Sequence, residues 1–166
     1  MVYGSGLNGV AVHDDDIEAM QPLHAPAEVG GSDVWPSRVG PERWPPSFAW
    51  QTLRQAGARL AFGSDWPVVS QNPFLGMANA LQRVPWLPGQ PDQRQSLMDI
   101  LAAYTRDAAY AEFQEHQKGQ LRPGCLADMV LLPGDLLDMT AEEIGEIRPL
   151  TTICDGRIVF DSNSRQ

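Results

Sequence analysis

The chain has 166 residues, a length typical of one ordinary domain or two small ones. Hydrophobic residues make up 43% of the chain and charged residues 20%, which is a globular composition rather than a disordered one. The formal net charge of -9 disfavours binding to nucleic acids or anionic membranes, because an acidic surface repels both, so we expect neither partner.

Signals that would direct the chain to a membrane or out of the cell are not recognisable. No apolar run approaches the roughly 20 residues that a membrane span needs. The first residues, MVYGSGLNGVAVHDDD, lack a basic region followed by a long apolar core. Cys125 and Cys154 are too few for a disulfide framework and too far apart for a close-spaced metal pair. These features predict a soluble cytoplasmic protein with free thiols.

Residues 1–19 are expected to form an irregular segment. The sequence GSGLNG at positions 4–9 matches the spacing of a dinucleotide-binding fingerprint, but the required strand before it and helix after it are missing. The sequence HDDD at positions 13–16 resembles a metal cluster only in composition. Because consecutive side chains cannot easily face one ion, we interpret it as a solvated helix start.

The next part of the chain, residues 20–84, has the order strand, loop, helix, strand, helix, which is typical of an α/β layer. The expected elements are a short strand and a Pro-bounded turn at 17–26, a long Gly- and Pro-rich loop at 27–46, a helix at 47–57, a strand at 58–66 and a helix at 72–84. Ser47 and Asn72 are expected to cap the two helices, and Gly57 to stop the first. The strand at 58–66 begins with a nearly continuous apolar run, which predicts burial on both faces as in a parallel sheet.

A linker at 84–93 precedes a helical pattern at 96–113, where apolar residues recur at helical spacing. We expect Thr105 to divide this pattern by capping a second helix. From Lys118 the pattern changes to a small antiparallel sheet, with a strand at 127–132, a short helix at 140–147 and a hairpin at 151–160 around Asp155-Gly156.

Neither the α/β part nor the final hairpin contains enough strands to close a sheet. A parallel sheet buries both faces and needs several strands, and an isolated hairpin is marginally stable in water. We therefore expect both parts to be pieces of larger structures.

Several motifs resemble, in order, the C-terminal third of metal-dependent amidohydrolases, most closely the amidohydrolase 3 or YtcJ-like group. The motifs lie between Met20 and Phe160 and read MQPLHA, GPER, LRQAGARLAFGSDWPV, NPFLGM, AYTRDAAYAEFQEHQKGQLRPGCLADMVLL and DGRIVF. Each motif alone is weak, whereas the ordered set is highly specific. The resemblance implies the C-terminal portion of a (β/α)8 TIM-type barrel at 20–117, and the C-terminal strands of a small β-sandwich at 118–166.

The same resemblance implies hydrolysis of amide-like C–N bonds in small molecules with a divalent metal, usually zinc. It places Asp65 where the family carries the aspartate that ends the last barrel strand, contacts the metal and acts as general base. Barrel chemistry gathers at the C-terminal ends of strands, and a metal lowers the pKa of bound water toward about 7. Trp66-Pro67 would fix the exit of the chain behind the acid. From the residues alone, Asp65 also fits the role of a turn residue.

Three further residues are candidates for substrate binding by resemblance. His24 matches the family histidine after strand seven, and its alternative is a loop histidine that bonds the backbone. Arg38 and Arg43 lie in the loop that covers the pocket in the family, where a guanidinium fork suits a carboxylate or carbonyl oxygen. Their alternative is surface charge, and His116 is expected to be exposed.

The sequence lacks most of the family's metal ligands. No His-x-His pair occurs, and of the expected ligands only Asp65 is present, whereas catalytic zinc usually needs three protein ligands. We therefore expect the isolated chain to be inactive and to retain no metal. Two alternatives are a non-catalytic remnant that forms homo-oligomers through exposed sheet edges, and an independent α/β binding module.

Overall fold

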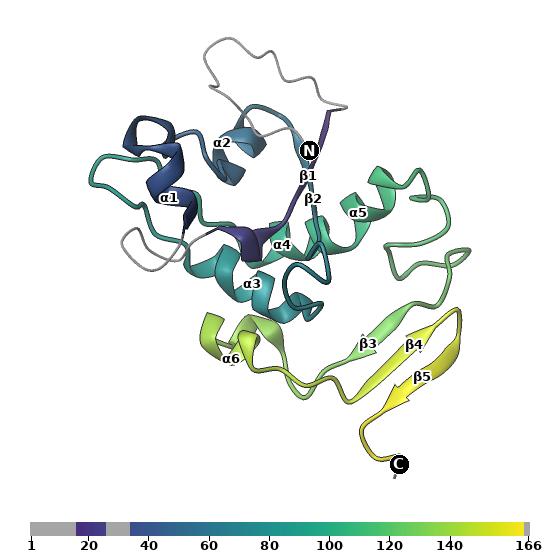
Figure 1. The fold of residues 1–166 in the computed structure, drawn as a ribbon. Helices are drawn as coiled ribbons and strands as arrows, with labels where there is room; N and C mark the ends of the chain where they lie inside the picture. Colours follow the sequence, from purple (N-terminus) through teal and green to yellow (C-terminus); the bar gives the residue numbers. More distant parts are fainter. Residues whose placement is uncertain (1–15, 26–33, 165–166) are drawn as a thin grey trace.

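The computed structural model describes residues 16–25 and 34–164, apart from the side chain of Trp35. It shows a mixed α/β fold with two separate small sheets (Figure 1). Helices surround the first sheet, and the second sheet lies at the C-terminal end of the molecule. The glycine motif at 4–9 and most of the HDDD sequence lie outside the described residues.

The first sheet consists of two parallel strands, β1 (Ile17–Met20) and β2 (Arg59–Phe62). Their register pairs Ile17 with Arg59 and Met20 with Phe62, and the Gly63 N–H donates to the Met20 carbonyl at 3.1 Å. Three of the four β2 residues are buried. This confirms that the apolar run forms a buried parallel strand.

The long loop expected at 27–46 is partly helical. It contains α1 (Val34–Val39) and the 3-10 turn η2 (Pro41–Arg43). Pro36 stands in the first turn of α1, where proline's missing N–H removes no helical hydrogen bond. The indole N–H of Trp44 donates to the Pro36 carbonyl at 3.1 Å. The prediction of a structureless loop was wrong, because these local bonds outweigh its Gly and Pro content.

The following helix, α2 (Trp50–Gln55), begins later than expected. Ser47 does not cap it, because the Ser47 hydroxyl donates to the Arg43 carbonyl at 2.6 Å instead. The predicted stop is confirmed: Gly57 has φ 102°, and its N–H donates to the Arg54 carbonyl at 3.0 Å.

Three helices follow in chain order, α3 (Pro73–Gln82), α4 (Leu97–Tyr104) and α5 (Arg106–Ala111). The Asn72 side chain caps α3 by accepting from the Phe74 N–H at 3.0 Å, as expected. Thr105 separates α4 from α5, also as expected. Its hydroxyl, however, donates backwards to the carbonyl of Leu101 at 2.6 Å, so it does not cap α5.

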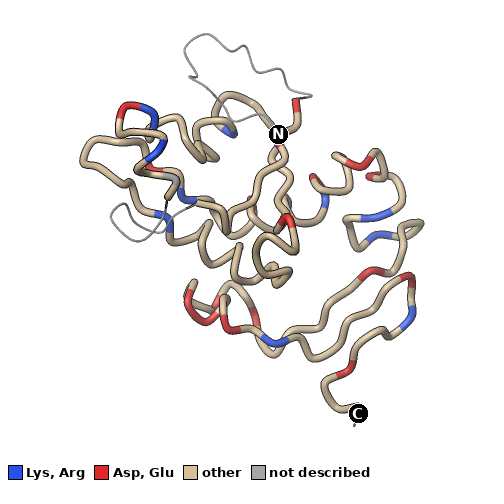
Figure 2. Tube along the Cα trace, viewed as in Figure 1, with Lys and Arg blue, Asp and Glu red and all other residues tan. Residues whose placement is uncertain are grey.

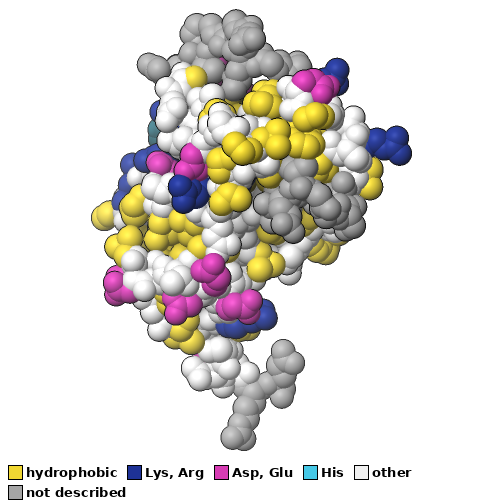
Figure 3. Space-filling model, turned by 90° about the vertical axis from the view of Figure 1, so that its left-hand side faces the viewer, with side chains coloured by type: hydrophobic (Ala, Val, Ile, Leu, Met, Phe, Trp, Pro, Cys, Tyr) yellow, Lys and Arg dark blue, Asp and Glu magenta, His cyan; other side chains and the backbone are white. Residues whose placement is uncertain are grey.

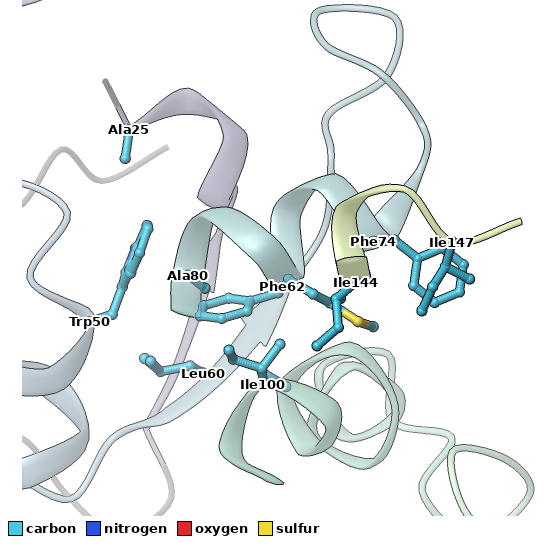
Figure 4. Close-up of a cluster of buried hydrophobic side chains, with 11 residues drawn as sticks. Ala25, Trp50, Leu60, Phe62, Phe74, Ala80, Ile100, Ile144 and Ile147 are labelled. Carbon is cyan, nitrogen blue, oxygen red and sulfur yellow. The ribbon is translucent and has the colours of Figure 1, made fainter. Parts of the chain in front are cut away.

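A cluster of buried side chains joins β2 to the helices (Figure 4). Its members are Ala25, Trp50, Leu60, Phe62, Phe74, Met77, Ala80, Ile100, Ala103, Ile144 and Ile147. Phe62 lies at its centre, because its ring meets Trp50 edge-on at a centroid distance of 5.9 Å and Tyr104 at 5.6 Å. Burial of these large rings fixes the position of the strand end that carries Asp65.

The second sheet is antiparallel, with the order β3 (Met129–Leu131), β4 (Thr151–Cys154) and β5 (Arg157–Asp161). The turn between β4 and β5 has φ 49° at Asp155 and 73° at Gly156. Positive φ at both central residues is what a tight two-residue hairpin requires, so the predicted hairpin is confirmed.

The short helix α6 (Ala141–Gly145) lies between β3 and β4 in the chain and follows the 3-10 turn η3 (Leu136–Asp138). Thr140 and Glu143 form a reciprocal capping box at its start. Within the described part of the chain, no helix is long and apolar enough to cross a membrane. Both described cysteines, Cys125 and Cys154, are free thiols.

Candidate functional site

Asp65 lies in an exposed loop that follows the carboxyl end of β2. It has φ 58°, a left-handed conformation that aspartate tolerates better than most residues. Its carbonyl accepts a hydrogen bond from the Val68 N–H at 2.9 Å, and the Trp66 N–H donates to the Ser64 hydroxyl at 3.2 Å. Asp65 is therefore both a turn residue and a carboxylate held at a strand end.

His24 ends the 3-10 turn η1 (Pro22–His24), which follows the carboxyl end of β1. Its backbone N–H donates to the Gln21 carbonyl at 3.0 Å. The side chain is half-buried, and its Nε2 atom is buried without a hydrogen-bond partner among the residues that the structure describes. Buried polar atoms usually have partners, so this nitrogen is a candidate for binding a ligand atom or a water.

Because β1 and β2 are parallel, their carboxyl ends meet at one edge of the sheet. His24 and Asp65 follow these two ends, and the fold therefore brings both residues to the same edge. This edge, with η1 and the loop 63–72, is called the carboxyl edge below. It is the place where parallel α/β folds carry their active sites.

Asn79 of α3 anchors the turn that carries His24, a role that we did not predict. Its side-chain amide donates to the carbonyls of Pro22 at 2.5 Å and Ala25 at 3.3 Å. Asparagine is a weak helix former, so an asparagine in the middle of α3 was the available signal.

Arg38 and Arg43 both lie on the α1–η2 segment and are exposed. Figure 2 shows the basic residues of this segment on the opposite side of the fold from the second sheet. Among the described residues, no hydrogen bond or ion pair joins either guanidinium to His24 or Asp65. Their role in substrate binding therefore stays a prediction.

Two apolar side chains stand in solvent next to Asp65. Trp66 is 65% exposed and Val68 is 67% exposed. That Trp66-Pro67 fixes the exit of the chain behind the acid stays a prediction. Figure 3 shows one face of the molecule, on which hydrophobic side chains gather in broad areas between charged residues.

The donor atoms near Asp65 do not make a metal centre by themselves. Among the described residues, no group of three or more His, Cys, Asp or Glu side chains lies close enough to hold an ion. Catalytic zinc usually takes three protein ligands, so the residues present do not fit a zinc site. Two open hollows in the described part lie elsewhere, along β5 and along residues 121–129.

The clearest pKa shifts of buried groups belong to the core rather than to the carboxyl edge. Burial lowers the pKa of Arg83 to about 10 and raises the pKa of Tyr104 well above its usual range. Both groups therefore keep their ordinary protonation near neutral pH, and neither supplies an acid or base there.

A carboxylate at the carboxyl ends of parallel strands is a feature that many α/β enzymes share. The sequence profile of the Amidohydrolase family matches residues 4–160, nearly the whole chain. The chain therefore belongs to the amidohydrolase family, which confirms the resemblance. The matched region begins well before Met20, where inspection of the motifs placed the start of the resemblance.

Three curated proteins are similar to parts of the chain. Protein LONG AFTER FAR-RED 3 of Arabidopsis thaliana is 35% identical over 77% of this chain and 22% of its own length. A putative amidohydrolase, YtcJ, of Bacillus subtilis is 28% identical over 76% of this chain and 25% of its own. The N-substituted formamide deformylase of Arthrobacter pascens is 26% identical over 69% of this chain and 21% of its own.

Part of one solved structure has a fold similar to that of this chain. An uncharacterized metal-dependent hydrolase from Pyrococcus horikoshii is 26% identical, with a TM-score of 0.59, over 75% of this chain and 25% of its own. The chain thus spans about a quarter of the length of the relatives that it matches.

Proposed function

We propose that this chain is the C-terminal segment of a hydrolase that cleaves amide-like C–N bonds in small molecules, with Asp65 as the general base. The position of Asp65 at the carboxyl edge, within a chain of the amidohydrolase family, is the observation that supports the proposal. In this role the carboxylate takes a proton from water as the water oxygen attacks the carbonyl carbon. The proton then passes to the nitrogen as the C–N bond breaks.

We further propose that β1 and β2 are the last strands of a TIM-type barrel and that residues 118–166 belong to a β-sandwich. His24 would bind the substrate through its buried Nε2, which has no other partner in the described structure. Arg38 and Arg43 of the α1–η2 segment would bind a substrate carboxylate or carbonyl oxygen, as the resemblance implies.

The described residues alone supply too few ligands to hold a metal. We therefore assign no catalytic step to a metal bound by this chain. We propose that the isolated chain neither retains zinc in a 1:1 ratio nor hydrolyses amides. Metal analysis after dialysis against zinc, together with an assay on simple amides, tests this. Tight zinc at one equivalent with turnover would contradict it.

The role of Asp65 is testable in a chimera. The matching segment of the Arthrobacter pascens deformylase is replaced by this chain, and hydrolysis of an N-substituted formamide is measured. We expect Asp65→Asn to lower the rate by about 10²- to 10⁴-fold, the usual contribution of a general base. Asp92→Asn, which removes an exposed carboxylate on a distant loop, is the control and should retain the rate.

Either of two outcomes would contradict the proposal. One is an active chimera whose rate Asp65→Asn does not change. The other is a chimera that folds, by circular dichroism and sedimentation, yet hydrolyses no formamide.

Self-association through the second sheet is a second candidate function. Consecutive side chains of a strand point to opposite faces, and Ile158, Val159 and Phe160 of β5 are 65%, 62% and 48% exposed. Both faces of this edge strand are therefore open, which invites pairing. Sedimentation velocity tests this candidate: a concentration-dependent dimer supports it, and a monomer at every concentration contradicts it.

A further inference from the structure

Helix α3 connects the two candidate residues of the carboxyl edge. It begins directly after the loop 63–72 that carries Asp65, and the Asn72 side chain caps its first turn. Phe74 and Met77 bury one side of the helix in the core, where they are 7% and 6% exposed. The helix is therefore a fixed element to which a neighbouring segment can be attached.

The segment attached to α3 is the turn η1, which carries His24. The Asn79 side-chain amide donates to the Pro22 carbonyl at 2.5 Å and to the Ala25 carbonyl at 3.3 Å. These two carbonyls lie on either side of His24 in the chain. Pro22 and Ala25 are both buried, so little water can replace the amide if it is removed. One side chain thus holds the turn at both of its ends.

Close packing keeps α3 in place beside η1. Gly76 precedes Asn79 by three residues, so both lie on the same side of the helix. A Cβ added at Gly76 would lie 2.0 Å from the hydroxyl oxygen of Tyr104 and 3.8 Å from the Cβ of Pro22. This side of α3 is therefore packed against both α4 and η1, which leaves the helix little room to shift.

Asn79 acts on His24 only through the backbone of the turn. Its two bonds go to carbonyl groups, and no hydrogen bond among the described residues joins its side chain to the imidazole. The Nε2 atom of His24 is buried and has no partner in the described part of the chain. The direction of this nitrogen is therefore set by the turn and not by a bond that it makes itself.

We propose that Asn79 is a positioning residue that holds η1 so that the Nε2 atom of His24 faces the substrate at the carboxyl edge. This inference rests on the proposed function and adds the residue through which His24 depends on α3. Because α3 also follows the loop that carries Asp65, one helix fixes both candidate residues relative to each other.

The first test is an NMR measurement on the full chain, so it does not depend on catalytic activity. The ring signal of His24 is assigned by its loss in His24→Gln. Asn79→Ala removes both donors and introduces the strongest helix former, so α3 should persist. It should shift or broaden the ring signal of His24 and leave those of the other two histidines unchanged.

Asn163→Ala is the matched control, because Asn163 is an exposed asparagine that follows β5. It should leave the ring signal of His24 unchanged. Asn79→Ser retains one hydroxyl donor and should give a smaller shift than Asn79→Ala, and it replaces that variant if Asn79→Ala does not fold. A His24 signal that neither substitution of Asn79 moves would overturn the proposal.

The second test separates positioning from a general structural role, in the chimera with the deformylase. His24→Ala should raise KM by about two- to tenfold, as loss of one hydrogen bond predicts, and leave kcat unchanged. Asn79→Ala should raise KM by up to the same factor. The double variant should raise KM no further than His24→Ala alone, because both substitutions remove the same interaction.

A purely structural role of Asn79 predicts a different result. The two substitutions would then act independently, their effects on KM would multiply in the double variant, and the proposal would be overturned.

The inference and the proposed function fail separately. A KM that His24→Ala does not change would reject the substrate role of His24, whereas a shifted ring signal in Asn79→Ala would still show that Asn79 holds the turn. A chimera that depends on His24 and Asp65 but not on Asn79 would retain the proposed function and reject the inference.

Discussion

Arg83 is a buried arginine, because it is only 6% exposed. Its guanidinium carbon lies 4.4 Å from the ring centroid of Trp86 and 5.0 Å from that of Trp50. It donates to the carbonyl of Ser47 at 3.0 Å and to that of Phe48. Carbonyl oxygens and ring faces thus offset part of the cost of burying the charge, and burial still lowers the pKa of Arg83.

Arg83→Lys should lower the free energy of unfolding by about 1–3 kcal/mol, because an ammonium cannot reproduce the planar contacts of a guanidinium. Urea denaturation measures this. Arg94→Lys alters an exposed ion pair with Asp92 and should change the free energy of unfolding by less than about 0.5 kcal/mol. Equal effects of the two substitutions would show that the buried contacts of Arg83 do not stabilise the fold.

The pKa of Arg83 also predicts how stability depends on pH. Its folded-state pKa of about 10 lies below the ordinary 12.5, so between these values the unfolded chain binds more protons. The contribution of Arg83 to stability therefore rises with pH in that window and is flat near neutral pH.

Asp65 combines a left-handed backbone with an exposed side chain. Its contribution to the stability of the fold can therefore be measured separately from its proposed chemistry. Asp65→Asn should change the free energy of unfolding by less than about 0.5 kcal/mol, because asparagine also tolerates this conformation. Asp65→Val should lower it by about 1–2 kcal/mol, because a β-branched residue does not. Thermal and urea unfolding measure both, and a large loss in Asp65→Asn would mean that the carboxylate is needed for folding.

At the scale of elements, the segment after α5 depends on a close approach at Gly119. Gly119 has φ 86°, and an added Cβ would lie 2.7 Å from the Cβ of Ala109 and 2.8 Å from the carbonyl oxygen of Thr105. The segment can therefore pack against the junction of α4 and α5 only with glycine at this position.

Gly119→Ala should lower the free energy of unfolding by more than about 2 kcal/mol, through steric overlap added to the unfavourable φ. Gly124→Ala is the matched control: Gly124 has φ 92°, but nothing lies within 4 Å of its added Cβ. It should cost only the backbone term of about 1 kcal/mol. Equal losses, measured by urea denaturation, would mean that the contact with α5 is unimportant.

At the scale of the whole molecule, α6 connects the C-terminal part to the helix layer. Ile144 of α6 is fully buried, and Figure 4 shows it with Ile147 beside Phe74 of α3. The second sheet lies beyond this contact (Figure 1). It carries exposed apolar side chains. The contact of α6 with α3 is therefore a principal attachment of residues 118–166 to the rest of the fold.

Ile144→Ala should lower the free energy of unfolding by about 2–5 kcal/mol, the usual cost of a cavity in a core. Ile158→Ala, at a position that is 65% exposed, should lower it by less than about 0.5 kcal/mol. Circular dichroism during urea unfolding measures both. A large effect of Ile158→Ala instead would show that the second sheet is covered in solution.

Local patterns alone determined several features of this protein. The cap at Asn72, the stop at Gly57, the apolar strand β2 and the turn at Asp155-Gly156 all follow from residues that act within one turn or strand. The family was also determined by sequence, because an ordered set of motifs is specific even where each motif is weak.

Only the tertiary structure decided which distant residues meet. The parallel register brought His24 and Asp65 to one edge, Asn79 was found to anchor η1, and Arg38 and Arg43 were found on an exposed helical segment. Helix α1 and the buried Arg83 were likewise unexpected. The physical reason is that caps and turns depend on bonds between near neighbours, whereas these features depend on contacts between segments far apart in the chain, which no local pattern encodes.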